Sequence, residues 1–207
     1  VGNNITITAF NNINNQGNIV SDADMTIKTK GDLYNSLNII GYGDVAISAN
    51  SINNNNANIK ATGDISLTTT AHVRNNRGSI RSLMGNLSIE AAKGNVDNYS
   101  GKILSAGAID IKTNALNNDY GQVAGYSDID LALMGNFDSF RGSVLSQTGD
   151  IRLAANSVDN NYGFIAGKNV AIESKSGVYN NTAMIAANQK LTVTAAGNIE
   201  NRDGNNF

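Results

Sequence analysis

The stretch GDIRLAANSVDNNYGFIAG, residues 149–167, contains the repeating unit from which the whole chain is built. Ile151 and Leu153 alternate with polar or small residues, Val158 precedes an asparagine by two positions, and Ile165 precedes a glycine by two positions. Apolar residues two positions apart indicate β-strands, because successive side chains of a strand point to opposite faces. The unit therefore predicts three short strands separated by Gly, Asn and Ser turns.

The same pattern recurs about ten times, and each unit has four apolar positions. The first position advances by 20, 20, 20, 22, 22, 20, 22, 19 and 21 residues, and a period in this range is typical of a solenoid. The first two columns are Ile5, Met25, Val45, Ile65, Leu87, Ile109, Ile129, Ile151, Val170 and Leu191, and Ile7, Ile27, Ile47, Leu67, Ile89, Ile111, Leu131, Leu153, Ile172 and Val193. The third and fourth columns are Ile13, Leu33, Ile52, Val73, Val96, Leu116, Phe137, Val158, Val178 and Ile199, and Ile19, Ile39, Ile59, Ile80, Ile103, Val123, Val144, Ile165 and Ile185.

A single unit cannot be stable by itself. Burial of four large aliphatic side chains contributes about 6–12 kcal/mol, whereas ordering some twenty residues costs roughly 20–40 kcal/mol of backbone entropy. Stacked units add ladder hydrogen bonds and contacts between like side chains. We therefore predict an all-β chain that forms a right-handed parallel β-helix of about ten coils of 19–22 residues, since crossovers between parallel strands are almost always right-handed.

The composition excludes several classes of function. Charged residues make up 15% of the chain, the net charge is -2, and no basic stripe is visible, so we expect no nucleic-acid partner. The absence of cysteine excludes disulfides, thiolate zinc sites and thiol catalysis. No apolar run is long enough to cross a membrane, so we expect no membrane insertion. No sequence feature calls for a cofactor.

The repeat runs through the chain without a linker or a long insertion. Short insertions near Leu83–Gly85, Ala92–Asn95 and Met134–Gly135 account for the 22-residue steps. We therefore expect residues 1–207 to form a single β-helix segment. Polar caps, which a solenoid needs at its ends, are not evident, so we expect the segment to be excised from a longer filamentous protein.

An asparagine column is the most specific polar signal in the sequence. An amide has two donors and one acceptor, so stacked copies can bond to one another and to the turn backbone. Asparagine also tolerates the left-handed conformation that a sharp bend requires. We predict a structural ladder rather than a ligand-binding row, broken only by Ser139, that consists of Asn15, Asn35, Asn54, Asn75, Asn98, Asn118, Asn160, Asn180 and Asn201.

Residues 86–123, NLSIEAAKGNVDNYSGKILSAGAIDIKTNALNNDYGQV, resemble the haemagglutinin repeats of filamentous haemagglutinin. Similar repeats build the long exoproteins of bacterial two-partner secretion, including contact-dependent inhibition proteins. The Asn-Pro-rich motifs of that family's secretion domain are missing, because proline is absent, and no toxin-like module is visible. The resemblance implies a shaft segment, export through an outer-membrane transporter, and a secreted or surface-displayed protein that serves adhesion or toxin delivery.

Two features of the sequence are candidate metal sites. Stacked carboxylates could hold calcium, but Asp or Asn beside Gly is ordinary turn chemistry, and we predict that role instead. His72 is the only histidine and has no second nitrogen ligand, whereas zinc needs three or four ligands. We predict no metal site at His72 or in the carboxylate column, which consists of Asp24, Asp44, Asp64, Asn86, Asp128, Asp150 and Asn169.

Aromatic residues gather near one turn of the middle and later coils, where they should lie on neighbouring rungs. They are Tyr99, Tyr120, Phe140 and Tyr162, with Arg141 among them. Exposed rings in a row suit sugar faces or an apolar protein partner. The alternative is stacking that only protects the turn edges.

Three functions remain open from the sequence. The first is a shaft that holds a receptor-binding or toxin region away from the cell. The second is a segment that itself binds a surface receptor or glycan through the aromatic turn. The third is a polysaccharide-active enzyme, for which Asp110 and Asp130 occupy equivalent positions on adjacent coils. Arg152 on the next coil favours a charge ladder instead. No long loops exist to build a groove, so we predict no catalytic residues.

Overall fold

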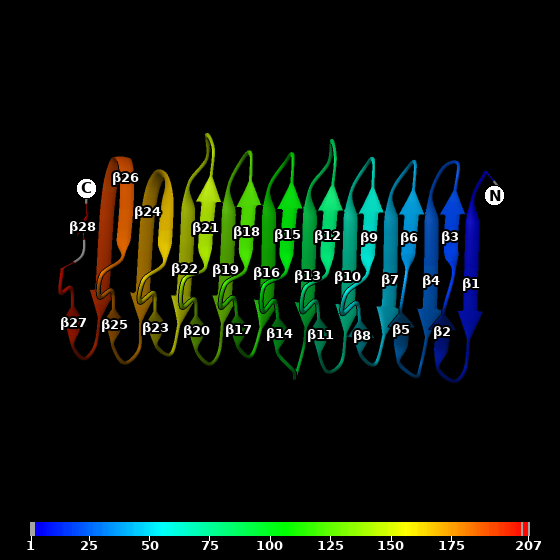
Figure 1. Ribbon diagram of the computed structural model, residues 1–207, viewed down its shortest axis with the longest axis horizontal. Coiled ribbons are helices and arrows are strands. Elements are labelled where there is room, and N and C mark those ends of the chain that lie inside the picture. The colour runs from blue at the N-terminus through cyan, green and yellow to red at the C-terminus, as the bar shows by residue number, and fades with distance from the viewer. Residues whose placement is uncertain (1–2, 204, 207) are drawn as a thin grey trace.

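The computed structural model describes residues 3–203 and 205–206, which form 28 β-strands and no helix. The chain winds into a row of coils stacked along one axis, with the two termini at opposite ends (Figure 1). Strands in equivalent positions of successive coils pair in parallel, as Ile109 pairs with Ile129 and Ile129 with Ile151. The predicted all-β parallel β-helix of about ten coils is confirmed.

Most coils contribute three strands. The first strands are β1 (Ile5–Ala9), β4 (Met25–Thr29), β7 (Val45–Ala49), β10 (Ile65–Thr69), β13 (Leu87–Ala91), β16 (Ile109–Thr113), β19 (Ile129–Leu133) and β22 (Ile151–Ala155). The second strands are β2 (Ile13–Asn15), β5 (Leu33–Asn35), β8 (Ile52–Asn53), β11 (Val73–Arg74), β14 (Val96–Asp97), β17 (Leu116–Asn117), β20 (Phe137–Asp138), β23 (Val158–Asp159), β25 (Val178–Tyr179) and β27 (Ile199–Glu200). The third strands are β3 (Asn18–Ser21), β6 (Asn38–Gly41), β9 (Asn58–Ala61), β12 (Ser79–Ser82), β15 (Lys102–Ser105), β18 (Gln122–Gly125) and β21 (Ser143–Ser146), followed near the C-terminus by β28 (Asn205–Asn206).

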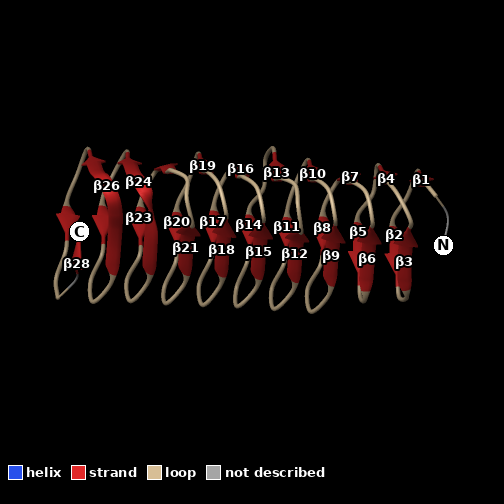
Figure 2. Cartoon of the chain, turned by 90° about the horizontal axis from the view of Figure 1, so that it is seen from above, coloured by secondary structure: helices blue, strands red, loops and turns tan. Residues whose placement is uncertain are grey.

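In the last coils no turn separates the third strand from the first strand of the next coil, contrary to the expectation from the sequence. There the third strand of one coil continues into the first strand of the next, as β24 (Phe164–Ser174) and β26 (Met184–Ala195), the long strands at the C-terminal end in Figure 2. In β24 only Lys168 and Asn169 separate Gly167 from Val170, so the chain bends without leaving the ladder, and the register shifts between Gly167 and Asn169. These two strands join the first and third strands into an 18-stranded sheet, beside a ten-stranded sheet of second strands.

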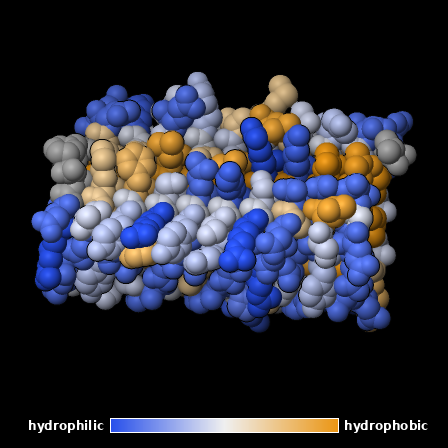
Figure 3. Space-filling model, in the orientation of Figure 1, coloured by the Kyte–Doolittle hydropathy of each residue, from blue (hydrophilic) through white to orange (hydrophobic). Residues whose placement is uncertain are grey.

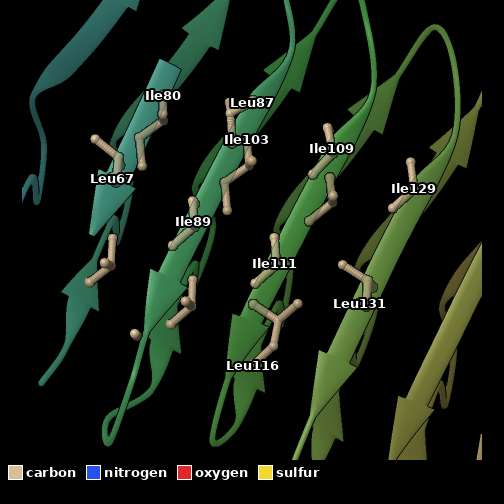
Figure 4. Close-up of a cluster of buried hydrophobic side chains, with 14 of the residues drawn as sticks. Leu67, Ile80, Leu87, Ile89, Ile103, Ile109, Ile111, Leu116, Ile129 and Leu131 are labelled. Atoms are coloured by element: carbon tan, nitrogen blue, oxygen red, sulfur yellow. The ribbon is translucent and has the colours of Figure 1, made fainter. Parts of the chain in front are cut away.

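The four apolar columns fill the interior. From Met25 to Ile185 they are buried, and the close-up shows like side chains such as Ile89, Ile111 and Leu131 one above another on successive coils (Figure 4). The end coils have a neighbour on one side only, so Ile5, Ile7, Ile13 and Ile19 in the first coil are partly buried, and Ile199 in the last coil is 53% exposed. In the part of the chain that the structure describes, no helix has the length and apolar character needed to cross a membrane.

Candidate functional site

The asparagine column forms a chain of side-chain hydrogen bonds inside the turn that follows the second strands. Each amide Nδ2 donates to the Oδ1 of the asparagine one coil further on, at 2.7–2.9 Å. The same Nδ2 atoms also reach backbone carbonyls, as Asn75 does to Gly78 and Lys102. The side chains from Asn15 to Asn180 in this column are buried, and Asn201 in the last coil is exposed.

Ser139 interrupts this ladder. Asn118 still donates to Ser139 Oγ at 3.2 Å, but the short serine side chain does not reach the next coil. As a result Asn160 Oδ1 is buried without a hydrogen-bond partner. An unpaired buried acceptor costs free energy, so this rung is the weak point of the ladder.

The bend in the turn does not depend on a left-handed conformation of the ladder asparagines, contrary to the sequence-based expectation. The positive φ angles, between 50° and 59°, fall two residues after the ladder position, where the turn must reverse. The residues there have varied side chains, and they are Asn56, Arg77, Ser100, Tyr120, Arg141, Tyr162, Thr182 and Asp203.

The carboxylate column bonds to the backbone of the next coil. Asp24 Oδ1 accepts from the amide of Asp44, Asp44 Oδ1 from that of Asp64, and the pattern continues at Asn86 and at Asp128. An aspartate that holds a neighbouring turn in this way orders the corner of the coil. Among residues 3–203 no group of three or more His, Cys, Asp or Glu side chains is placed to hold a metal ion.

His72 also bonds to the backbone, since its Nδ1 accepts from the amide of Asn95 at 3.2 Å. This contact joins two coils across the turn between the first and second strands. It gives the histidine a structural contact of the same kind as the carboxylate column.

Asp110 and Asp130 lie in register on adjacent coils, as the pattern predicted. Each carboxylate has a basic partner, however, because Lys112 Nζ lies 2.8 Å from Asp110 and the Arg152 guanidinium lies 3.3 Å from Asp130. The hydrogen bond that Arg152 donates to Asp130 is the main reason why the pKa of Arg152 is raised. Arg152 also approaches Asp128 and Asp150, at 3.7 and 3.6 Å. The arrangement is an exposed ion-pair network on a flat strand face rather than a pair of catalytic acids.

The structure brings the four predicted rings together. The ring centroids lie 5.6 Å apart for Tyr99 and Tyr120, 5.6 Å for Tyr120 and Phe140, and 5.3 Å for Phe140 and Tyr162. The interplanar angles of 64–70° are edge-to-face. Arg141 places its guanidinium 5.4 Å from the Phe140 centroid and 5.6 Å from the Tyr162 centroid. We call Tyr99, Tyr120, Phe140 and Tyr162 the aromatic ladder.

The rings meet edge-to-face because they come from two alternating turn positions. Tyr99 and Phe140 directly follow the ladder residues of their coils, whereas Tyr120 and Tyr162 stand one position later, at the left-handed residue. Neighbouring rings therefore leave the backbone in different directions, and an edge meets a face, the arrangement that the ring quadrupole favours. Tyr99, Tyr120 and Tyr162 remain 40–51% exposed.

Beside the aromatic ladder lies a group of carboxylates that sequence reasoning missed. Asp138 and Asp159 are paired in register on adjacent coils, and Asp119 lies in the turn next to Tyr120. All three are partly buried. Burial, followed by the charges of Asp119 and Asp159, raises the pKa of Asp138 above its ordinary value. The signal in the sequence is the Asp that directly follows the third apolar position in these two coils.

Sequence reasoning also missed an open groove along the outer face of the third strands. It has a volume of about 520 Å³ and crosses six coils, from Arg81 to Asn188. Leu104, Ala124 and Leu145 are among its lining residues, as is Tyr126. Figure 3 shows that hydrophobic side chains gather over the third strands, above a mostly hydrophilic half of the same face. The signal is a second apolar residue directly after the buried one in several third strands, as in KIL and SVL.

A second inward polar column was missed as well. The hydroxyls of Ser82, Ser105 and Ser146, at the ends of third strands, donate to backbone carbonyls of the preceding coil at 2.6–2.7 Å. Each of these serines stands two residues after a buried apolar residue of the fourth column. They lie at the last residues of the third strands, whereas the asparagine ladder lies before the first residues of those strands.

Comparison with known proteins gives one family. The family model described as Haemagglutinin repeat matches residues 1–69, 42–98, 66–135 and 122–203, which together span nearly the whole chain. No curated protein and no solved structure matches the chain.

Proposed function

Because the chain belongs to the haemagglutinin repeat family, we propose that it is a shaft segment of a large secreted or surface-displayed bacterial adhesin or contact-dependent toxin-delivery exoprotein. Its task is to hold a receptor-binding or toxin region away from the cell. Export through an outer-membrane two-partner secretion transporter belongs to the same proposal, as does a position within a longer filament.

The observation that carries this proposal is the unbroken stacking of the coils. Parallel pairing runs from β1 to β28, with a register shift only in β24 among the described strands, and the buried side chains form one continuous cluster along the axis. Each coil adds about 4.8 Å of length, so ten coils extend a filament by roughly 45 Å. In such a fold the length of the rod grows in proportion to the number of coils, because every coil is stabilised mainly by its two neighbours.

The outer surface supports a structural role over a catalytic one. Asp110 and Asp130, the carboxylates considered as a catalytic pair, form ion pairs with Lys112 and Arg152. The family is one of structural adhesins, and no described feature points to a reaction. An assay for reducing ends released from bacterial and host polysaccharides tests the enzymatic alternative, and a positive result would displace the shaft proposal.

Deletion of whole coils tests the shaft directly in the cell that displays the protein. Removing residues 45–86 takes out two coils and joins Asp44 to Leu87 in register. We expect adhesion or toxin delivery to persist with a filament shorter by about 10 Å. Removing residues 45–55 deletes half a coil, breaks the register and should abolish display. Loss of adhesion by the two-coil deletion, with normal surface display, would contradict the proposal.

A further inference from the structure

The aromatic ladder already holds a cation. The guanidinium of Arg141 lies over Phe140 and Tyr162, 5.4 and 5.6 Å from the ring centroids. This distance is within the range in which a cation is attracted to the face of an aromatic ring. No described cation lies over Tyr99 or Tyr120, although both rings are 40–46% exposed and belong to the same edge-to-face stack. Two rings of the ladder therefore have a cation partner within the described part of the chain, and two do not.

The carboxylates beside the ladder lack positive partners. Asp138 and Asp159 face each other on adjacent rungs, and like charges in directly paired positions destabilise a sheet. Asp119 and Asp159 each accept one backbone hydrogen bond, from Phe140 and Asn161. Among the described residues no Lys, Arg or His side chain forms a salt bridge with Asp119, Asp138 or Asp159. The described surface thus keeps three partly buried carboxylates without ion-pair partners, one on each of the coils that carry Tyr120, Phe140 and Tyr162.

We propose that the face formed by Tyr99, Tyr120, Asp119, Asp138 and Asp159 is a docking site for an arginine-rich, extended segment of a protein partner. Guanidinium groups stack on aromatic rings and form paired hydrogen bonds with carboxylates, so one side chain can use both features of this face. An extended segment matches a surface whose groups repeat from coil to coil. Arg141, over Phe140 and Tyr162, shows within the chain how a guanidinium lies against these rings.

This site goes beyond the shaft role and is independent of it. The two-coil deletion of residues 45–86 leaves all five docking residues in place. If the chain is a shaft but has no docking site, the two-coil deletion keeps adhesion and the protein does not bind the arginine-rich segment. If the chain has the docking site but is not a shaft, the protein binds the arginine-rich segment, and the two-coil deletion abolishes adhesion. The two failures are therefore distinguishable.

Titration calorimetry of the 207-residue protein with acetyl-tetra-arginine amide at low ionic strength tests the proposal. We expect binding to the wild type that weakens about two- to fivefold in Asp138→Asn and in Tyr120→Asn, since each contact is worth about 0.5–1 kcal/mol at an exposed site. Asparagine is chosen at Tyr120 because it tolerates the φ of 55° found there. Arg141→Asn should strengthen binding by a similar factor, because it removes the internal cation that competes with the probe for Phe140 and Tyr162.

Two matched controls stand away from the face. Asp22→Asn removes one exposed carboxylate and Tyr42→Asn removes one exposed ring, which is 63% exposed, both near turns that follow early third strands. Neither should change the affinity, and circular dichroism should show that every variant keeps its strands. Equal weakening by Asp22→Asn, unchanged affinity in Asp138→Asn and Tyr120→Asn, or no binding by the wild type would overturn the proposal. Tighter binding of neutral oligosaccharides than of the arginine probe would also overturn it, in favour of a glycan.

Discussion

Asn54 donates a hydrogen bond from Nδ2 to Oδ1 of Asn75, 21 residues further along the chain, at 2.7 Å, and both side chains are fully buried. Such a contact joins two coils through their side chains, in addition to the backbone ladders. Repeated at nearly every coil, it keeps the turn polar groups satisfied where water cannot reach them.

The first prediction concerns this contact. Asn75→Ala removes the donor for Asn98 Oδ1 and the acceptor for Asn54, so we expect a loss of about 1–3 kcal/mol in the free energy of unfolding. Asn160→Ala should cost less, because Asn160 Oδ1 already lacks a partner. Urea denaturation followed by circular dichroism measures both.

Arg152→Ala is the control for these variants. Its ion pairs are exposed, with 56% of the arginine side chain accessible, and pairs of this kind contribute at most about 1 kcal/mol. Equal stabilities of the Asn75→Ala and Arg152→Ala proteins would mean that the ladder does not stabilise the fold.

The second prediction concerns close approach between coils. A Cβ atom added at Gly94 would overlap the backbone carbonyl of Ala71 in the preceding coil, whereas one at Gly17 would meet nothing within 4 Å. Gly94→Ala should therefore destabilise the protein by about 1–3 kcal/mol, because backbone must shift. Gly17→Ala should be neutral or stabilise by up to about 1 kcal/mol, since it restricts the unfolded chain. Thermal unfolding of the two single variants distinguishes them, and a Gly94→Ala protein as stable as Gly17→Ala would exclude tight packing at this turn.

The third prediction follows from Asp138. Because its pKa is raised by burial and by neighbouring carboxylates, the folded state favours the protonated form. The stability that this carboxyl contributes is present at low pH and is lost as the pH rises through the raised pKa. Asp138→Asn should therefore raise the melting temperature at pH 7 by roughly 1–4 °C.

The gain should disappear below pH 3.8, the ordinary value, where the carboxyl is protonated in both states. Melting curves of wild type and Asp138→Asn across this range provide the measurement. A melting temperature that falls at pH 7 on substitution would show that Asp138 has a stabilising partner instead.

The core was predictable because two simple periods determine it. Alternation within a strand and a step of about twenty residues together place Ile109 on Ile129, and no other information is needed. The aromatic ladder follows from the same step, since Tyr99 and Tyr120 must lie on adjacent coils. Their edge-to-face geometry does not follow, because it depends on which of two turn positions each ring occupies.

The left-handed residue was not predictable from residue type. This position holds Asn56 in one coil, but Arg77, Tyr120 and Thr182 in others, and bulky or β-branched residues normally avoid positive φ. The turn imposes the conformation, since the flanking ladder residue is fixed by its hydrogen bonds. The groove over Leu104 and Leu145 was missed for a related reason, because outward side chains on different coils form a surface only after the coils are stacked.

The last prediction concerns the gap in the asparagine ladder at Ser139. Asn118 Nδ2 donates to Ser139 Oγ, but Asn160 Oδ1 receives nothing and is fully buried. An asparagine at position 139 would accept from Asn118 and donate to Asn160, as Asn98 does between Asn75 and Asn118. Ser139→Asn should therefore raise the free energy of unfolding by about 1–3 kcal/mol.

A double-mutant cycle identifies the source of that gain. In an Asn160→Ala background, Ser139→Asn can only replace the bond that Asn118 already donates to Ser139 Oγ, so its effect should fall by at least about 0.5 kcal/mol. Ser48→Asn, on the exposed face of β7, should leave the stability unchanged. A Ser139→Asn protein no more stable than wild type, or one whose gain is the same with and without Asn160, would show that the unpaired oxygen carries no cost. The ladder would then be a consequence of stacking and not one of its causes.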